Sequence, residues 1–204
     1  MSVQADSHAP TTGRLALVQA LLNTRDLDSG RDELDTSDHV RRWLVRNRLL
    51  PPDAVVEQSD RQQLIDVRRA IHELVASNGR PTMDRRAVAV LNEAARRIRL
   101  GVRLHPEDGY RLMAEGVGID RPIGDLLVRV MSAMADGTWS RLKVCANEAC
   151  GRAYHDGSRN RSGRWCSMAA CGNRMKGRAY RLRRGSAAGG AIATPPPLAA
   201  AAAG

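Results

Sequence analysis

The chain has 204 residues, which is enough for one ordinary domain and a smaller one, or for two modest domains. Hydrophobic residues make up 43% and charged residues 26%, the balance of a water-soluble protein with a packed core. No stretch approaches the roughly 18 apolar residues that span a bilayer, and the N-terminus lacks the pattern of a secretory signal. We therefore expect a cytoplasmic protein without a membrane partner.

The net charge of +10 is confined to one part of the chain. Residues 1–140 contain 20 basic and 20 acidic side chains, which cancel. Residues 141–184 contain 12 basic side chains against only Glu148 and Asp156, and residues 185–204 contain no charged side chain. The segment 141–184 also holds all four cysteines, so a basic, cysteine-rich module is the starting point for any interpretation of function.

The first 50 residues predict two helices. A short helix is expected over 14–23, where apolar side chains recur at helical spacing, and a polar, turn-rich loop follows it. Thr36 is the expected N-cap of a second helix, which should run as far as Leu50 because Pro51 and Pro52 end it.

Two longer helices come next. Ser59 and Gln62 predict a capping box at the start of a helix with an apolar stripe over 64–75, closed by Asn78 and Gly79. Thr82 is the expected N-cap of the following helix, whose apolar side chains are Val88, Leu91, Ala95 and Ile98.

The rest of the N-terminal region predicts a hairpin and one more helix. Residues 101–104 and 110–115 alternate in character around a Pro-Glu-Asp-Gly turn, which indicates a small β-hairpin. Asp120 should begin a last helix that Gly137 stops. The predicted fold class is therefore α+β, with a mostly helical domain over 13–137, a small β element and a separate module over 141–184. The uncharged tail over 185–204, rich in Ala, Gly and Pro, is predicted to be disordered.

The four cysteines form two pairs with metal-ligand spacing. Four residues separate Cys145 from Cys150, four separate Cys166 from Cys171, and fifteen lie between the pairs. Each pair can supply two corners of a tetrahedron while the insert returns the chain to the ion. The spacing predicts one structural Zn²⁺ held by four thiolates, with no open position for a reactive water.

Other uses of the cysteines stay open at this point. Packing of reduced cysteines and formation of two disulfides both disagree with the paired spacing and with a cytoplasmic protein. The spacing alone does not distinguish zinc from iron–sulfur ligation. A zinc–thiolate redox sensor is a further alternative, because oxidation of the thiolates releases the metal.

Short elements are expected to bring the ligands together. Leu142 and Val144 should lie in a strand that leads into the first pair, with Ala153 and Tyr154 in the return strand. Ser167 should N-cap a helix that places Cys171 in its first turns. These elements describe a small, treble-clef-like zinc finger.

Basic side chains surround this finger. Three lie on the insert loop and six follow the second cysteine pair: Arg159, Arg161, Arg164, Arg174, Lys176, Arg178, Arg181, Arg183 and Arg184. With four thiolates on Zn²⁺, the segment 141–184 keeps a charge of about +8, a density that favours a polyanion partner. A solvated basic face that serves solubility is the alternative.

The residues around the cysteines resemble a known family. Between Cys145 and Arg174 the chain contains Tyr154-His155-Asp156, Arg159-Asn160-Arg161, Arg164-Trp165-Cys166-Ser167-Met168 and Cys171-Gly172-Asn173-Arg174, which is similar to the CGNR zinc finger. The N-terminal part, with Leu22-Asn23-Thr24-Arg25, the helix with Trp43-Leu44 and the long helix over 64–75, resembles the ABATE domain that precedes this finger. Two departures are Tyr154, where Phe is more typical, and Gln19-Ala20-Leu21, where the family has Asp and an aromatic residue.

The resemblance implies a bacterial transcription regulator of a kind linked to stress, with zinc at the four cysteines and a finger that binds DNA. It implies an α/β N-terminal domain for sensing or dimerisation. Within the finger, Trp165 is expected to pack over the zinc knuckles. Asp156 and Asn173 are expected to steady the ligands or the loop.

We therefore predict a DNA-binding transcription regulator, with homodimerisation through residues 13–137 as a further expectation. A zinc-dependent module that binds protein or RNA is the main alternative. An enzyme is not expected, because His39, His72 and His105 occur singly and no nucleophile elbow or phosphate-binding glycine loop is present.

Overall fold

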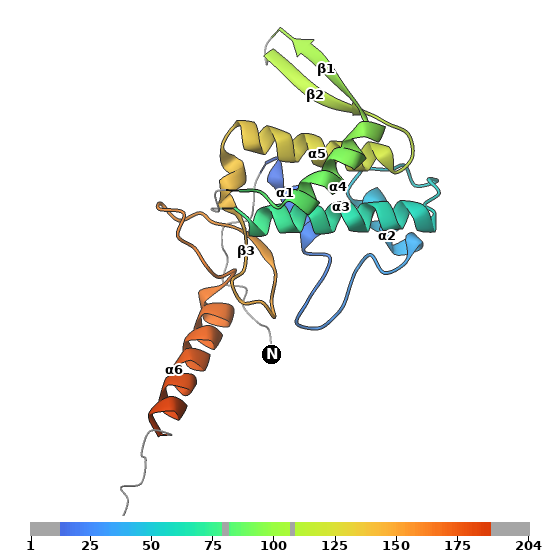
Figure 1. Ribbon diagram of the computed structural model, residues 1–204. Helices are drawn as coiled ribbons and strands as arrows, with labels where there is room; N and C mark the ends of the chain where they lie inside the picture. The colour runs from blue at the N-terminus through green and yellow to red at the C-terminus, as the bar shows by residue number, and fades with distance from the viewer. Residues whose placement is uncertain (1–12, 79–81, 107–108, 189–204) are drawn as a thin grey trace, which may run out of the picture.

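The computed structural model describes residues 13–78, 82–106 and 109–188, and its elements follow one another as in Figure 1. The N-terminal region contains α1 (Leu15–Leu22), α2 (Ser37–Arg46), α3 (Gln58–Ala76), α4 (Arg85–Arg97), β1 (Arg99–His105), β2 (Gly109–Glu115) and α5 (Asp120–Ala135). The C-terminal region contains the 3-10 turn η1 (Thr138–Arg141), β3 (Leu142–Val144), β4 (Ala153–His155), the π turn η2 (Met168–Gly172) and α6 (Asn173–Ala188). The mixed class, mostly helical with small sheets, is as predicted.

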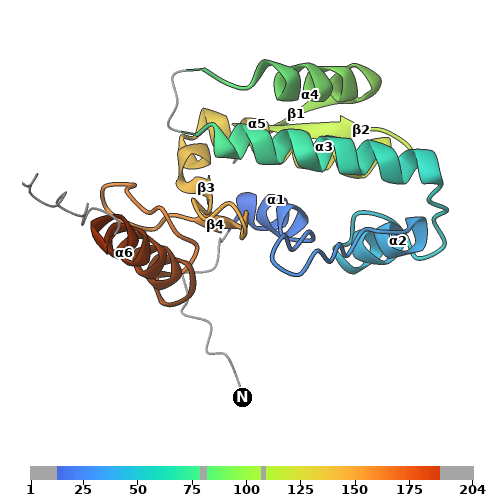
Figure 2. The same cartoon turned by 60° about the horizontal axis from the view of Figure 1, so that its bottom comes forward.

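Helix α3 is the centre of the fold. Its apolar stripe, including Leu64, Ile71 and Val75, is buried against α1, α2 and α4. The buried apolar residues form one continuous cluster that also includes Leu142 of β3 and Ala153 of β4. In Figure 2 these two strands lie between α1 and α6. The helical region and the cysteine-rich segment therefore share a single hydrophobic core.

The predicted hairpin over residues 101–115 is present, and its first strand begins two residues earlier and ends one residue later than predicted. Strands β1 and β2 pair in antiparallel register from Arg99 opposite Glu115 to His105 opposite Gly109. The base of β2 packs on α5, where Ala114 is buried beside Gly124. A Cβ on Gly124 would come within 2.8 Å of Ile98, so this close approach requires glycine. From this contact the hairpin projects away from the helices (Figure 1).

The start of α2 is confirmed, but its end is not. Thr36 is the N-cap, and its hydroxyl accepts a hydrogen bond from the His39 N–H at 3.1 Å. The helix stops at Arg46, four residues before the predicted end, because Arg48 takes a left-handed conformation with φ 58°. The prolines therefore follow a short turn and do not themselves terminate the helix.

Two of the predicted N-caps are wrong. The capping box of α3 is formed by Glu57 and Asp60, two residues before the predicted pair of Ser59 and Gln62, and Asp60 accepts from the Glu57 N–H at 2.9 Å. Helix α4 is capped by Asp84 and not by Thr82, with the Ala87 N–H donating to the Asp84 carboxylate at 2.8 Å. In both cases a carboxylate occupies the helix N-terminus, where the macrodipole favours negative charge.

Three sequence predictions fall partly outside the residues that the structure describes. Helix α6 continues to Ala188, four residues into the segment predicted to be disordered, and residues 189–204 lie outside the described residues. Gly79 and the Glu107-Asp108 part of the hairpin turn also lie outside them. Among the helices that are described, none has the length and apolar character needed to cross a bilayer.

Candidate metal centre and nucleic-acid interface

Short elements deliver the four cysteines to one place. Strand β3 ends at Val144, so Cys145 follows it directly, and the Cys145 N–H donates to the Arg152 carbonyl at 2.9 Å to close the first knuckle. The second pair depends on Ser167, which caps η2 by accepting from the Ala170 N–H at 3.2 Å. Cys171 therefore sits in the first turn, as predicted.

The sulfur atoms have the separations of a single tetrahedral ion. All four Sγ atoms lie within 4.8 Å of one another, with 3.6 Å between Cys150 and Cys166 and 3.8 Å between Cys166 and Cys171. Zinc–sulfur bonds of about 2.3 Å in a tetrahedron place the sulfurs about 3.8 Å apart. A disulfide needs about 2.05 Å, and a multi-iron cluster would push the sulfurs further apart. The residues fit one structural zinc ion.

Zinc must displace the proton of each thiol that is protonated before the ion binds. Burial raises the pKa of Cys150 to about 11 and also raises the pKa of Cys166. Burial opposes ionisation of Cys171 too, but a hydrogen bond from the Asn147 amide, 3.6 Å from its sulfur, helps to lower the pKa of that thiol. Metal binding therefore releases thiol protons, and zinc affinity falls as the pH falls.

Asn147 was missed by the sequence analysis. It is 5% exposed, and its carbonyl accepts from the N–H groups of Cys150 and Gly151 while its side chain donates to Cys171. It therefore links the two cysteine pairs. Asn173, for which this kind of role was expected, lies exposed at the start of α6. The place of Asn147 in the sequence, between Cys145 and Cys150, was the one feature that could have indicated this role.

Asp156 holds the insert loop, as expected. It is 1% exposed and accepts from Lys143 Nζ at 2.6 Å, Ser158 N–H at 3.0 Å and Gly163 N–H at 2.9 Å. Burial by itself would raise the pKa of Asp156, but these hydrogen bonds outweigh it and hold the pKa far below its usual range. The basic loop is thus anchored to a buried carboxylate.

Trp165 lies beside the second pair of ligands. It is partly exposed, and its Cδ1 atom would be 3.3 Å from a Cβ placed on Gly172, the residue after Cys171. The Arg164 guanidinium lies 5.3 Å from the centre of the indole ring, a cation–π contact. This placement agrees with the expected packing of Trp165 near the zinc knuckles.

Helix α6 presents the largest group of cations. It projects away from the body of the protein in Figures 1 and 2, and all its basic residues through Arg184 are exposed. Arg159, Lys176, Arg178 and Arg181 make no hydrogen bond or ion pair within the described residues. Arg184 lies on the ring of Tyr180, 5.7 Å from its centre. Arg161 donates to Ser140 at 3.0 Å.

Polar side chains of the helical region hold the finger. Asn23 exchanges two hydrogen bonds with the backbone of Ala153, both 2.9 Å long. His72 Nε2 donates to the Gly151 carbonyl at 2.8 Å, and Asn78 donates to the carbonyls of Trp139 and Leu142 at 3.0 and 2.8 Å. Arg174 of α6 reaches Asp28 at 3.3 Å. The finger is docked onto the helices and is not tethered by a linker.

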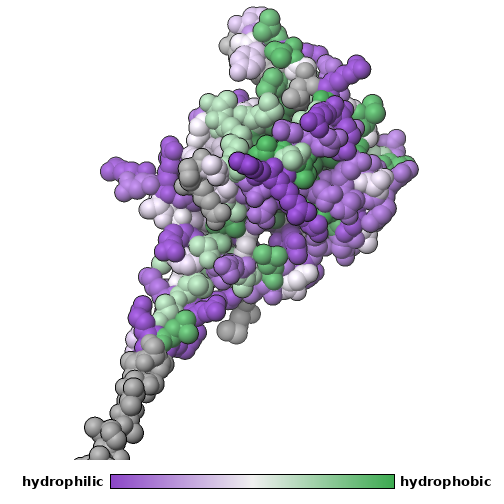
Figure 3. Space-filling view, in the orientation of Figure 1, coloured by the Kyte–Doolittle hydropathy of each residue, from purple (hydrophilic) through white to green (hydrophobic). Residues whose placement is uncertain are grey.

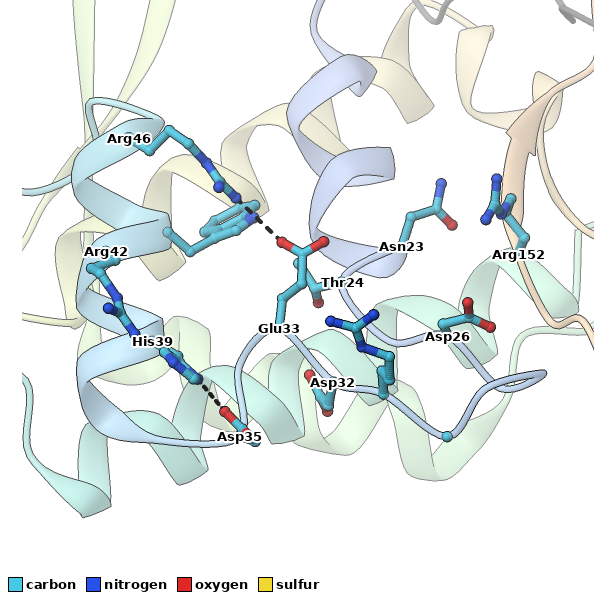
Figure 4. Close-up of a pocket in the computed structure, with 13 residues that line it drawn as sticks. Asn23, Thr24, Asp26, Asp32, Glu33, Asp35, His39, Arg42, Arg46 and Arg152 are labelled. Atoms are coloured by element: carbon cyan, nitrogen blue, oxygen red, sulfur yellow. Dashed lines mark hydrogen bonds and ion pairs between the residues drawn. The ribbon is translucent and has the colours of Figure 1, made fainter. Parts of the chain in front are cut away.

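A pocket of about 780 Å³ opens next to this contact. Figure 4 shows Asn23 and Arg152 on one side, His39, Arg42 and Arg46 of α2 on the other, and acidic residues of the α1–α2 loop between them. Glu33 pairs with Arg46 at 3.3 Å, and Asp35 pairs with His39. Asp32, which also lines the pocket, forms a salt bridge of 2.5 Å with Arg68, whose side chain is only 4% exposed. The pocket is therefore lined by residues of both the finger and the helical region.

Comparison with known families matches both parts of the chain. The model of the CGNR zinc finger matches residues 141–184. The ABATE model, described as "Putative stress-induced transcription regulator", matches residues 15–137, more than half of the chain. Comparison with curated proteins gave no match.

Proposed function

Because this chain belongs to the ABATE family and carries a CGNR zinc finger, we propose that it is a DNA-binding transcription regulator that acts in the cytoplasm and catalyses no reaction. The finger supplies the contact with DNA. The helical region receives the signal or pairs two copies of the chain.

One observation carries this proposal. The whole charge excess of the chain lies on one segment, in which a single metal site gathers the four cysteines and a buried carboxylate anchors the arginine loop. A basic surface that served only solubility would not need Asp156 and Lys143 to fix the arginine loop from within. Preorganised guanidinium groups suit phosphates, which they bind in a bidentate manner.

The α6 helix is the proposed docking element. Arg174, Arg178 and Arg181 follow one another at i, i+4 and i+7, so they share a helical face. Arg159, Arg161 and Arg164 on the loop, with Lys176, Arg183 and Arg184 on the other sides of α6, supply further cations. We assign these residues to phosphate and groove contacts.

The pocket beside the finger supports a sensing role for the helical region. Its wall includes Arg152, which lies two residues after Cys150, so a bound molecule would touch the metal module directly. Among the described residues, the four cysteines are the one group of three or more metal-type ligands, which favours regulation over metal-dependent catalysis.

The test is a titration of labelled duplex DNA with zinc-loaded protein at several salt concentrations. The triple variant Arg174→Ala, Arg178→Ala, Arg181→Ala should bind more weakly and reduce the slope of log affinity against log salt by up to about three. The matched control replaces three exposed arginines of the helical region, Arg85, Arg86 and Arg99, with alanine. Equal losses in both triple variants would contradict the assignment to α6.

The alternative function is binding of RNA or of an acidic protein through the same basic residues of the finger. Duplex DNA, structured RNA and heparin should be compared as competitors of the labelled duplex. Competition by duplex DNA well above that by heparin or RNA supports DNA binding. Equal competition by heparin would overturn it in favour of a general polyanion surface.

A further inference from the structure

Helix α6 stands apart from the body of the protein. Among the described elements its main packing contact is η2, from which it starts, and Arg174 near its base pairs with Asp28 at 3.3 Å. Every residue over 178–184 is exposed, including Tyr180 at 54% and Leu182 at 67%. On the face shown in Figure 3, hydrophilic and hydrophobic residues lie side by side along this projecting helix. Within the described chain, tertiary packing therefore does little to hold these residues in a helix.

The sequence of α6 also opposes a stable isolated helix. The helix is 16 residues long and contains Gly177 and Gly185, and glycine is the least favourable residue in a helix after proline. It contains six basic residues and no acidic residue. Arg178 and Arg181 are three residues apart, as are Arg181 and Arg184, so like charges lie next to one another on the helix surface. Even alanine-rich helices of about 12–15 residues are only marginally stable in water.

The basic insert loop over 157–164 is built differently. Asp156, which is 1% exposed, accepts from Lys143 Nζ at 2.6 Å and from the Gly163 N–H at 2.9 Å. The loop cations are thus held in place before a partner binds. The cations of α6, in contrast, keep their places only as long as the helix itself is formed.

We propose that α6 beyond Gly177 is only partly helical in the free chain and becomes a complete helix when it lies along the phosphates of duplex DNA. A phosphate close to two of these arginines removes the repulsion that unwinds the helix, so binding and helix formation support each other. The inference rests on the proposed DNA-binding function and adds a folding step to it. The anchored loop then supplies a fixed contact, while α6 follows the shape of the DNA that it meets.

The helical fraction of the free chain should set its affinity for DNA. When only a fraction of the molecules has the binding-competent conformation, the apparent dissociation constant is the intrinsic value divided by that fraction. A substitution that raises the helical fraction should therefore tighten binding without adding a contact. Gly177 suits this purpose, because its φ is not positive and a Cβ there would lie 3.6 Å from the Arg181 guanidinium, an ordinary contact.

Hydrogen exchange of the full-length, zinc-loaded protein tests the free state without nucleic acid. Amides over 178–184 should be protected less than about tenfold at low salt, and their protection should rise as added salt screens the like charges. The buried stripe of α3 over 64–75 is the internal control and should stay strongly protected at every salt concentration. Strong protection over 178–184 that does not change with salt would overturn the inference, whatever the affinity for DNA.

The same measurement with duplex DNA tests the coupling. A saturating duplex should protect the amides over 178–184. Gly177→Ala should raise DNA affinity by about two- to fivefold, and Ala179→Gly should lower it by about three- to fivefold. The matched control is Ala89→Gly, which makes the second change at an exposed position of α4 and should leave DNA affinity unchanged.

The outcomes separate this inference from the DNA-binding function. A duplex that binds without protecting residues 178–184 would overturn the inference and leave the DNA-binding function standing. The same holds if the affinity ignores both Gly177→Ala and Ala179→Gly. A protein that binds no duplex would overturn the DNA-binding function and this folding step together.

Discussion

Asn23 and Ala153, 130 positions apart, bind each other as two strands of a sheet would. The Asn23 side chain donates to the Ala153 carbonyl and accepts from the Ala153 N–H, so an amide side chain pairs with the backbone of β4. Asn23 follows α1, and Ala153 is fully buried. This pair fastens the zinc finger to the helical region at the edge of the shared core.

Asn23→Ala should loosen this junction. It removes both hydrogen bonds and leaves two backbone groups of a buried residue unsatisfied, so the free energy of unfolding should fall by about 1–3 kcal/mol. Urea denaturation followed by circular dichroism measures the change. Asn92→Ala, at an exposed position of α4, is the control and should change stability little. Equal stability of both variants would show that the junction contributes nothing.

Zinc removal should unfold the finger. A segment of this size with few aliphatic residues depends on the metal, whose binding contributes on the order of 10 kcal/mol to folding of such modules. Elemental analysis should find one zinc per chain, and chelation should abolish protection of residues 145–171 in hydrogen exchange. Protein reloaded with zinc is the control. Unchanged protection in metal-free protein would rule out a structural ion.

Asp156→Ala should free the arginine loop while zinc stays bound. The variant leaves the Lys143 ammonium without its carboxylate and removes the acceptor for Ser158 and Gly163. Loss of a buried, charge-assisted network of this kind costs about 3–5 kcal/mol. Proteolysis should therefore cut the loop over 157–164 faster than in the wild type. Glu148→Ala, which removes the other acidic residue of the finger at an exposed position, should not change the cutting rate.

The salt bridge between Asp32 and Arg68 should make the free energy of unfolding depend on pH in the acidic range. Burial acts to raise the pKa of Asp32, but the Arg68 hydrogen bond and charge outweigh it and lower the pKa. The stabilisation is therefore fully present above the unfolded pKa of about 3.9 and is lost as the pH falls through the lower folded value. Asp32→Asn should lower the free energy of unfolding by about 1–3 kcal/mol at pH 7, and by progressively less as the pH falls below about 3.9. The exposed Asp53→Asn is the control, and a difference that grows in acid would contradict the assignment.

Asp28→Asn should strengthen DNA binding if α6 is the docking element. Asp28 is paired with Arg174 at 3.3 Å, and both side chains are more than half exposed. Since exposed pairs contribute at most about 1 kcal/mol, releasing Arg174 should raise affinity by a factor of about two to five. Asp53→Asn again serves as the comparison, because it removes the same charge far from the finger.

The local chemistry of the site was predictable from the sequence. Paired cysteine spacing, the Ser167 cap and the strands around Leu142 and Ala153 depend on residues close to one another in the chain, where pattern and spacing are informative. Asp156 was also expected to steady the ligands or the loop, and it does fix the loop through residues close to it in the chain.

The docking of the finger was not predictable. His72 stood out in the sequence only as an isolated histidine, yet it donates to Gly151. Asn78 was expected only to close a helix, yet it binds Trp139 and Leu142. Such contacts join residues 61 to 130 positions apart, and nothing local marks them. The wrong caps of α3 and α4 have a simpler cause, since each site offered a hydroxyl and a carboxylate within two or three residues.

Because the finger and the helical region share one hydrophobic core, zinc binding should affect the stability of the whole chain. Leu142 and Ala153 contribute to the same apolar cluster as Leu64 and Ile71, so the helices lose packing partners when the ion leaves. By mass action, each tenfold rise in free zinc above the dissociation constant adds about 1.4 kcal/mol to the stability of the folded chain. The melting temperature of the helical region should thus follow zinc availability, and a cell short of zinc would hold less of this regulator in its native state.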